Sequence, residues 1–398
     1  MARMSPNLMS SGLRLSEVQD PIIPKVQKWV LDNPGTISLG QGIVSYGPPA
    51  EALEALAGFG EMASDHRYGP VSGDFELQSL LIRKLRQENG LALGAEQAVF
   101  VSAGSNMAFF EIILAITVPG DEVLLPVPFY FNHEMALRML GCTPVPVSTR
   151  PDFSLDLEAI ARAITAKTRA IVTVSPNNPS GQVYAERDLR AVNQLCKAHG
   201  LYHLSDEAYE YFIWGNTAHF SPTSIPGSES FTVGFFSLSK TFGFAGWRMG
   251  YMVFPSNLVN ELTKIQDTNL ICPPRPSQRA AMGALKLGRS YFDRHALGLL
   301  RLRDEVLALL GSLGPLLRSQ PQSEGAFYVF LEVDTSLSGL ELAERLAFEH
   351  GVAVVPGEAF GMQFGCYLRV AYGAPDPEKV REGVGRLVLG IRAICGRP

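Results

Sequence analysis

The chain has few cysteines and no long apolar run, and each absence removes a class of protein. Its five cysteines are scattered over 398 residues without a metal-binding spacing, so we expect no metal site and no disulfide framework. Such usage favours the reducing cytoplasm. No apolar run reaches the ~20 residues of a membrane span; the best candidate, 109–118, is short and contains Glu111. Residues 1–15 have no apolar core of the signal-peptide type.

The chain also lacks an excess of basic residues. It has 34 lysines and arginines against 39 aspartates and glutamates, a formal net charge of -5 at pH 7. A surface of that sign favours neither nucleic acid nor an anionic membrane, so we expect neither as a partner. The hydrophobic share of 46% is that of a globular protein, and the length suits one large domain with a smaller one.

Short apolar runs alternate with helical patterns from about residue 75 to 255. The predicted strands are residues 98–101, 122–125, 144–147, 170–174, 201–204, 232–236 and 250–253. Predicted helices at 106–116, 132–139 and 186–198 lie between several of them. Strands that are apolar throughout and alternate with helices indicate an α/β fold, with a mainly parallel sheet covered by helices on both faces. Ligands of such sheets bind outside the carboxyl ends of the strands.

The pattern changes near residue 296 to that of a smaller α+β unit. It predicts helices at 297–313, 340–350 and 376–394, and strands at 325–330, 352–355 and 367–371. The proline-rich residues 272–276 predict a stiff loop within the larger unit. We expect residues 1–50 to form an arm and part of the small domain, 51–295 the large domain and 296–398 the rest of the small domain.

Lys240 is the most informative residue, because it lies between the apolar run 231–236 and a glycine-rich loop. Burial disfavours the charged form of lysine, and only the neutral amine attacks a carbonyl group. Ser237, Ser239 and Arg248 are close in sequence and suit a phosphate group. A nucleophilic lysine beside a phosphate site suggests a Schiff base with pyridoxal 5'-phosphate (PLP), whereas a lone Ser-Lys pair would indicate a surface loop.

Polar residues follow several of the predicted strands. Asp206 follows strand 201–204; a buried carboxylate there needs a cation such as a protonated pyridine nitrogen, unless it is only a helix N-cap. Asn178, after strand 170–174, could donate to the phenolic oxygen of the cofactor, with Tyr209 as a second donor. The turn-forming sequence around Asn178 is the simpler alternative.

Three further segments offer binding groups. Ser105 and Asn106 open an apolar helix, whose free N–H groups favour a phosphate; Ser105 as a plain cap is compatible with this. Tyr130 follows another strand and could either stack on the cofactor or pack in the core. Arg369 interrupts an apolar strand; its planar fork matches a carboxylate, unless it is an exposed strand residue.

Taken in order, these residues resemble the fold-type I PLP-dependent aminotransferases of class I/II, the aspartate aminotransferase superfamily. The resemblance covers nearly the whole chain. Its motifs are Gly42, Tyr68-Gly69-Pro70 with Gly73, Ala103 to Asn106, Tyr130, Asn178-Pro179-Ser180-Gly181, Asp206 with Tyr209, Ser237 with Lys240 and Arg248, and Arg369.

The resemblance implies a reaction that moves an amino group between an α-amino acid and a 2-oxo acid by a ping-pong mechanism. Lys240 would form the internal aldimine and then carry the proton. Asp206 would pair with the pyridine nitrogen, and Asn178 and Tyr209 would hold the phenolic oxygen.

The resemblance also implies the remaining contacts. The residues that would hold the phosphate are Ser105, Asn106, Ser237 and Arg248. Arg369 would bind the α-carboxylate of the substrate, assisted by Gly42 and Asn178. Tyr68 matches a family tyrosine that reaches the phosphate of the neighbouring subunit, which implies a homodimer with shared active sites.

Two departures from the family bear on the substrate. The N-terminal loop reads Gly42-Ile43-Val44-Ser45-Tyr46, where many relatives carry Gly-x-Pro-x-Phe. The sequence also shows no second arginine for a distal carboxylate. Both favour an aromatic or aliphatic amino donor over an acidic one.

Other reactions stay open at this point. A carbon–sulfur lyase or another elimination enzyme would use the same Lys240, Asp206 and Asn178. A PLP-binding regulator is disfavoured, because such regulators carry an N-terminal DNA-binding domain and only about fifty residues precede the large domain here. A nicotinamide oxidoreductase is excluded, because no Gly-x-Gly-x-x-Gly follows the first strand.

Overall fold

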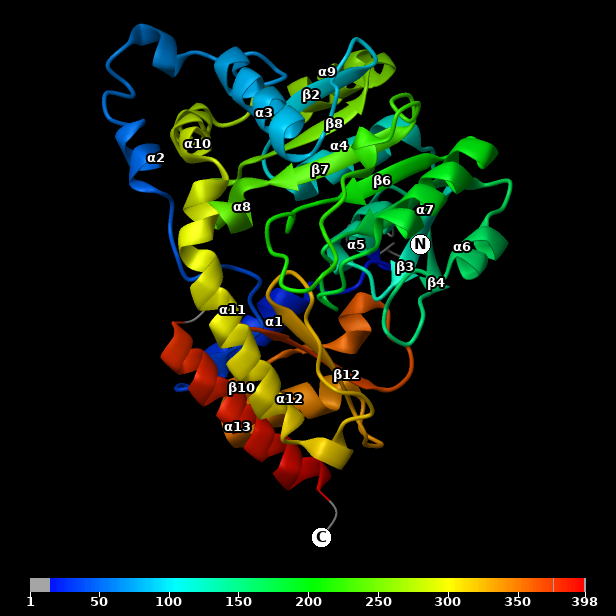
Figure 1. Cartoon of the computed structure of the whole chain (residues 1–398), viewed down its shortest axis with the longest axis vertical. Helices are drawn as coiled ribbons and strands as arrows, with labels where there is room; N and C mark the ends of the chain where they lie inside the picture. Colours follow the sequence, from blue (N-terminus) through cyan, green and yellow to red (C-terminus); the bar gives the residue numbers. More distant parts are fainter. Residues whose placement is uncertain (1–14, 375, 397–398) are drawn as a thin grey trace, which may run out of the picture.

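A seven-stranded sheet occupies the upper part of the molecule in the computed structural model, which describes residues 15–374 and 376–396 (Figure 1). Residues 1–14 of the predicted arm lie outside the described residues. The strand order is β2-β8-β7-β6-β5-β3-β4. The strands are β2 (Gln97–Ser102), β3 (Glu122–Val127), β4 (Thr143–Ser148), β5 (Thr168–Val174), β6 (Tyr202–Asp206), β7 (Thr232–Ser237) and β8 (Gly250–Pro255). Only β8 runs in the direction opposite to the other six strands, so the predicted mainly parallel sheet is confirmed.

Helices cover both faces of this sheet because successive strand residues point to opposite sides. In β7, Phe235 packs in the core on one face and Phe236 in the core on the other. The first face is covered by α4 (Ser105–Ile116), α5 (Phe131–Met139) and α9 (Val259–Asn269). The other face is covered by α3 (Phe75–Glu88), α6 (Leu157–Ala163), α7 (Glu186–His199) and α10 (Arg275–Leu287). Burial on both faces explains why the strands are apolar throughout.

Two small sheets form the lower part of the molecule (Figure 1). One is antiparallel, in the order β11-β12-β9, with β9 (Tyr328–Val333), β11 (Val355–Pro356) and β12 (Cys366–Ala371). The other pairs β1 (Ile37–Ser38) in parallel with β10 (Val352–Ala353), which joins the N-terminal segment to the C-terminal one. The chain changes sheets at Val354, so the strand predicted at 352–355 is two strands. Helices α1 (Ile22–Asp32), α12 (Gly339–His350) and α13 (Pro377–Cys395) pack against these sheets.

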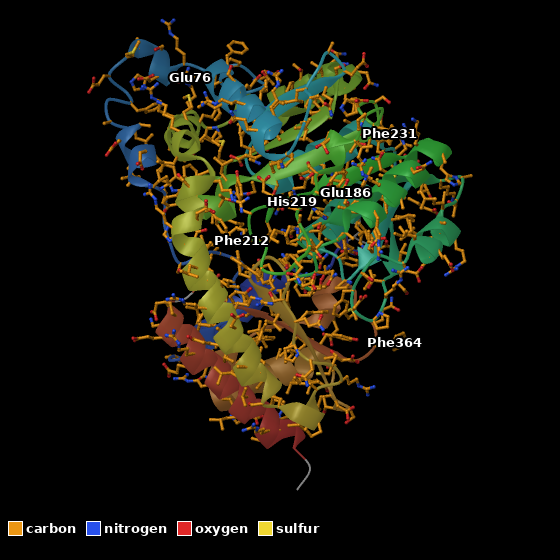
Figure 2. The ribbon with its side chains drawn as sticks, viewed as in Figure 1. Glu76, Glu186, Phe212, His219, Phe231 and Phe364 are labelled. Carbon is orange, nitrogen blue, oxygen red and sulfur yellow. The ribbon has the colours of Figure 1, made fainter. Side chains whose placement is uncertain are left out.

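A long helix, α11 (Arg289–Gly311), runs from beside the large sheet down to the small sheets (Figure 1). It begins well before the predicted start at 297, and the predicted domain boundary at 295 falls inside it. The boundaries at 50 and 295 stay predictions. Figure 2 shows Phe212 beside this helix, where its ring lies 4.6 Å from that of Phe292. The N–H of Ala326 also donates to the Phe212 carbonyl at 2.9 Å, which ties the two parts together.

The stiff loop predicted at 272–276 is only partly correct, because α10 begins at Arg275 and contains Pro276 in its first turn. Proline is tolerated there, since the N–H that it lacks would have no partner in the helix. The sequence pattern also does not predict α10 itself. The buried residues of α10 are mostly small. A Cβ at Gly283 would lie 2.1 Å from the carbonyl oxygen of Glu51, a residue of α2 (Ala50–Glu54). Small residues permit this close contact between α10 and α2.

Within the described ranges, no helix combines the length and apolar character needed to cross a bilayer.

Candidate active site

The carboxyl ends of β5, β6 and β7 bring three predicted site residues into one cavity. Asp206 ends β6, Lys240 lies on the short helix α8 (Leu238–Thr241) directly after β7, and Asn178 lies in the loop after β5. Because these strands are neighbours in the sheet, their ends meet at one edge. The cavity encloses about 520 Å³, its open mouth included. Its lining residues are Ser105, Asn106, Tyr130, Val174, Asn178, Asp206, Ala208, Tyr209, Ser237, Ser239, Lys240 and Arg248.

Lys240 presents its amine at the junction of this cavity with a second one. Its Nζ donates a hydrogen bond to the carbonyl oxygen of Gly42, in the loop after β1. Burial, reinforced by the positive charges of Arg369 and Arg248, lowers the pKa of Lys240 to about 8. A substantial fraction of the amine is therefore neutral, and able to attack a carbonyl, near pH 8.

Asp206 is only 5% exposed and holds two partners. Its Oδ1 accepts from the N–H of Ala208 at 3.1 Å, and its Oδ2 lies 3.1 Å from Nε2 of His133. No helix starts at residues 207–211, so the helix N-cap alternative for Asp206 is wrong. His133 is buried on α5, and its ring stacks on Phe109 with centroids 4.1 Å apart. The pair places a carboxylate at the cavity wall, and the imidazole of His133 holds it in position.

A polar cradle forms where α4 begins. Gly104 has φ +90°, and a Cβ there would lie 2.4 Å from Nη2 of Arg248. The guanidinium of Arg248 donates to the carbonyls of Ala245 at 3.0 Å and Ala103 at 3.3 Å, which fixes its position beside Ser105 in the cavity wall. Arg248 itself has φ 54°, a backbone conformation that is uncommon for a side chain of this size. The N-terminus of α4, the hydroxyls of Ser105 and Ser237 and the fixed guanidinium of Arg248 together fit an anionic group such as phosphate.

Arg369, on β12, lines a second cavity that shares Lys240 with the first. It is 1% exposed, so the exposed-strand alternative is wrong. Its Nη1 donates to Oδ1 of Asn178 at 2.8 Å and its Nη2 to the carbonyl of Gly40 at 2.5 Å. Its Nε, although buried, has no hydrogen-bond partner among the described residues. A buried guanidinium with an unused N–H has the donor groups to bind a carboxylate.

The second cavity adjoins the first and measures about 670 Å³, open space included. Its lining residues are Pro21, Ile23, Pro24, Gly42, Tyr130, Phe131, Asn132, Asn178, Tyr209, Lys240, Tyr328 and Arg369. Lys240, Asn178, Tyr130 and Tyr209 line both cavities. The side chain of Lys240 is therefore accessible from both cavities.

Two tyrosines stand between the cavities. The hydroxyl of Tyr130 accepts from Nδ2 of Asn132 at 2.8 Å and of Asn106 at 3.4 Å. The hydroxyl of Tyr209 lies 2.6 Å from that of Tyr328. Burial raises the pKa of both Tyr130 and Tyr209, so both are neutral hydrogen-bonding groups at physiological pH.

Tyr68 is the predicted site residue that lines neither cavity of its own chain; its side chain is 77% exposed. Two residues of the site, His133 and Tyr328, are not predicted from the sequence. His133 lies in the first turn of a predicted helix, three residues after Tyr130, but that position alone does not indicate a partner for Asp206. Among the described residues, no group of three or more His, Cys, Asp or Glu side chains could hold a metal ion.

This sheet with a lysine and an aspartate at adjoining strand ends defines an enzyme of the fold-type I class, whose members use PLP. The family aminotransferase class I and II matches residues 34–387, and the chain belongs to that family. The fold and the aminotransferase function that the sequence predicts are thereby confirmed.

Known relatives match the chain over almost its full length. An aromatic aminotransferase of Arabidopsis thaliana is 33% identical, over 94% of each chain. An aspartate aminotransferase of Pyrococcus abyssi is also 33% identical, over 96% of this chain and 99% of its own. The solved structure of a Thermus thermophilus aspartate aminotransferase variant, 29% identical, covers 96% of this chain and all of its own with a TM-score of 0.87.

Proposed function

We propose that this aminotransferase binds PLP through Lys240 and moves an amino group between an α-amino acid and a 2-oxo acid. One observation carries the proposal: Lys240 lines both the cavity that holds Asp206 and Arg248 and the cavity that holds Arg369. A cofactor in the first cavity and a substrate carboxylate in the second would both lie within reach of one amine.

The residues of the first cavity fit the cofactor. The phosphate would be held by Ser105, Asn106, Ser237 and Arg248, which supply the helix N-terminus, the hydroxyls and the guanidinium. Asp206 would face the pyridine nitrogen, because a buried carboxylate favours a protonated ring nitrogen. Tyr209 and the Nδ2 group of Asn178 would donate to the phenolic oxygen, since Oδ1 of Asn178 already accepts from Arg369. When bound, PLP supplies an electron sink for the charge left on the α-carbon of the amino acid.

The residues of the second cavity bind and orient the substrate. Arg369 would bind the α-carboxylate, with Asn178 and the backbone of Gly42 beside it. Lys240 is partly neutral because its pKa is lowered. Its Nζ would therefore accept the α-proton of the substrate and donate a proton again later in the reaction. His133 would hold Asp206 in place throughout.

The cavity walls support a neutral amino donor. Ile23 and Phe131 are apolar, and among the lining residues only Lys240 and Arg369 are cationic. Both cations are already assigned to the cofactor and the α-carboxylate. An aromatic or aliphatic side chain would therefore meet a more suitable wall than a second carboxylate would.

We also propose a homodimer in the cytoplasm. The exposure of Tyr68 supports a role for it at the phosphate of the partner subunit's cofactor, and Leu53 and Met62, which are also exposed, would be covered in such a contact. All five cysteines are free, which is in accord with a reducing compartment.

The test is a panel of amino acids mixed one at a time with the purified, cofactor-loaded protein. Donors should change the visible absorption of the cofactor and yield the matching 2-oxo acid only in stoichiometric amount, until a 2-oxo acid acceptor is added. Lys240→Ala should abolish turnover, whereas Lys264→Ala, which changes an exposed lysine on α9, should not. Release of ammonia or thiol without an acceptor would show an elimination enzyme instead.

A further inference from the structure

A buried pair of hydroxyls links the two parts of the molecule inside the active site. Tyr209 lies just after β6 of the large sheet, and Tyr328 is the first residue of β9 in the small sheet. Their hydroxyl oxygens are 2.6 Å apart, and both side chains are buried. The residue that would hold the phenolic oxygen of the cofactor is thus itself held from the opposite part of the chain.

Tyr328 is enclosed on its other sides. The guanidinium carbon of Arg369 lies 4.6 Å from the centroid of the Tyr328 ring. A Cβ at Gly42 would lie 2.4 Å from the Tyr328 hydroxyl oxygen, so the backbone of residue 42 lies directly against that hydroxyl. Among the described residues, Tyr209 is the hydrogen-bond partner that the structure gives to this hydroxyl.

Counting hydrogens decides how the pair must be oriented. A tyrosine hydroxyl carries one hydrogen, so Tyr209 can donate either to Tyr328 or into the cavity. If Tyr328 donates, Tyr209 accepts and its own hydrogen is free for the cavity. The lining of the cavities favours this direction. Tyr209 lines both cavities, whereas Tyr328 lines only the second, so the hydrogen of Tyr209 is the one that can point into the first cavity.

We propose that Tyr328 is a positioning residue: it donates its O–H to the oxygen of Tyr209 and so directs the O–H of Tyr209 at the phenolic oxygen of the bound cofactor. The proposal rests on the proposed function, which gives Tyr209 that partner. The same residue would link the two cavities. Tyr328 orients Tyr209 through its hydroxyl, and its ring lies against the guanidinium of Arg369, which would bind the substrate.

Tyr328→Phe tests this directly, because it keeps the ring under Arg369 and removes only the hydroxyl. The readout is the pH at which the visible absorption of the bound cofactor changes, measured without substrate. A Tyr209 that has lost its donor binds the negative phenolic oxygen less well, so that pH should rise by about 0.5–1 unit. Tyr209→Phe should raise it further. The titratable groups that line the two cavities with the pair are unchanged in both variants: Tyr130, Asp206, Lys240, Arg248 and Arg369.

The double variant Tyr209→Phe/Tyr328→Phe separates an indirect role from a direct one. If Tyr328 acts through Tyr209, the double variant should titrate like Tyr209→Phe alone. Tyr372→Phe is the matched control: it also deletes a buried hydroxyl, bonded to Ser323 Oγ at 3.0 Å, but it lines neither cavity. It should titrate like the unchanged protein.

Two results would overturn the proposal. One is a Tyr328→Phe titration equal to that of the unchanged protein while Tyr209→Phe is shifted; the other is two shifts that add in the double variant. If Tyr328→Phe does not fold, Gly42→Ala serves instead, because its added methyl would displace the Tyr328 hydroxyl and should give the same upward shift; an unshifted titration would again count against the proposal. A protein that shows no visible cofactor band would contradict the proposed function rather than this inference.

Discussion

Nε2 of His133 lies 3.1 Å from Oδ2 of Asp206, and both side chains are almost fully buried. The pair joins the first turn of α5 to the end of β6. A buried carboxylate that loses its hydrogen-bond partner is left with an unmet desolvation cost, so the position of Asp206 depends on His133.

Replacing His133 should therefore weaken both cofactor binding and catalysis. We expect His133→Ala to lower kcat/KM about 10- to 100-fold, because a hydrogen bond to a charged group contributes ~1.5–3 kcal/mol. Steady-state kinetics and titration of the cofactor-free protein with PLP would measure the two effects. His199→Ala, at an exposed histidine on α7, is the control; equal kinetics in the two variants would refute the role.

Arg369→Lys should raise KM for the amino donor. The change keeps the charge but loses the planar fork, and with it the bonds to Asn178 and Gly40 that orient it. We expect kcat/KM to fall about 100-fold, mostly through KM, as measured with the best donor of the panel. Arg381→Lys, at an arginine paired with Glu305 on the surface, should leave the kinetics unchanged. A normal KM in Arg369→Lys would place the carboxylate elsewhere.

Gly104→Ala should damage the phosphate cradle. The residue needs φ +90°, and the added methyl would lie 2.4 Å from Nη2 of Arg248. We expect a loss of about 1–3 kcal/mol in stability and a weaker affinity for PLP, measured by thermal unfolding and by cofactor titration. Gly385→Ala on α13 is the matched change, because nothing lies within 4 Å of its added Cβ and its φ is ordinary. It should be neutral or stabilising. Equal effects of the two changes would argue against the cradle.

The attachment of PLP to the cofactor-free protein should depend on pH through Lys240. Its pKa, lowered to about 8 by burial, means that the neutral amine increases tenfold per pH unit below 8 and levels off above it. Rapid-mixing absorbance measurements between pH 6 and 10 should show a rate that follows this curve. A rate that continued to rise up to pH 10 would indicate an ordinary, unshifted lysine.

Much of the site follows from the sequence because a parallel sheet gathers the residues that follow its strands. Asp206 and Lys240 are far apart in the chain, but the rule that ligands bind at carboxyl strand ends places them together. No comparable rule pairs Tyr209 with Tyr328, which are 119 positions apart and belong to different sheets. His133, the partner of Asp206, is likewise not predictable, since the direction of its side chain depends on how α5 packs.

The burial of a side chain is harder to predict from the sequence than the group that it could bind. The sequence indicates that Arg369 could bind a carboxylate, but it leaves open whether the side chain is exposed. Its burial comes from the pairing of β12 with β9 and β11, from the rings of Tyr328 and Phe360 beside the guanidinium, and from its contacts with Asn178 and Gly40. Likewise the sheet change at Val354 has no local signal, because 352–355 is uniformly apolar.

The pairing of Ile37 with Val352 has a consequence for how the protein is made. During translation Ile37 is synthesised long before Val352. The strand β1 therefore has no partner while the residues of the seven-stranded sheet are synthesised. The small sheets, and with them the second cavity that Arg369 lines, can form only when translation is almost finished.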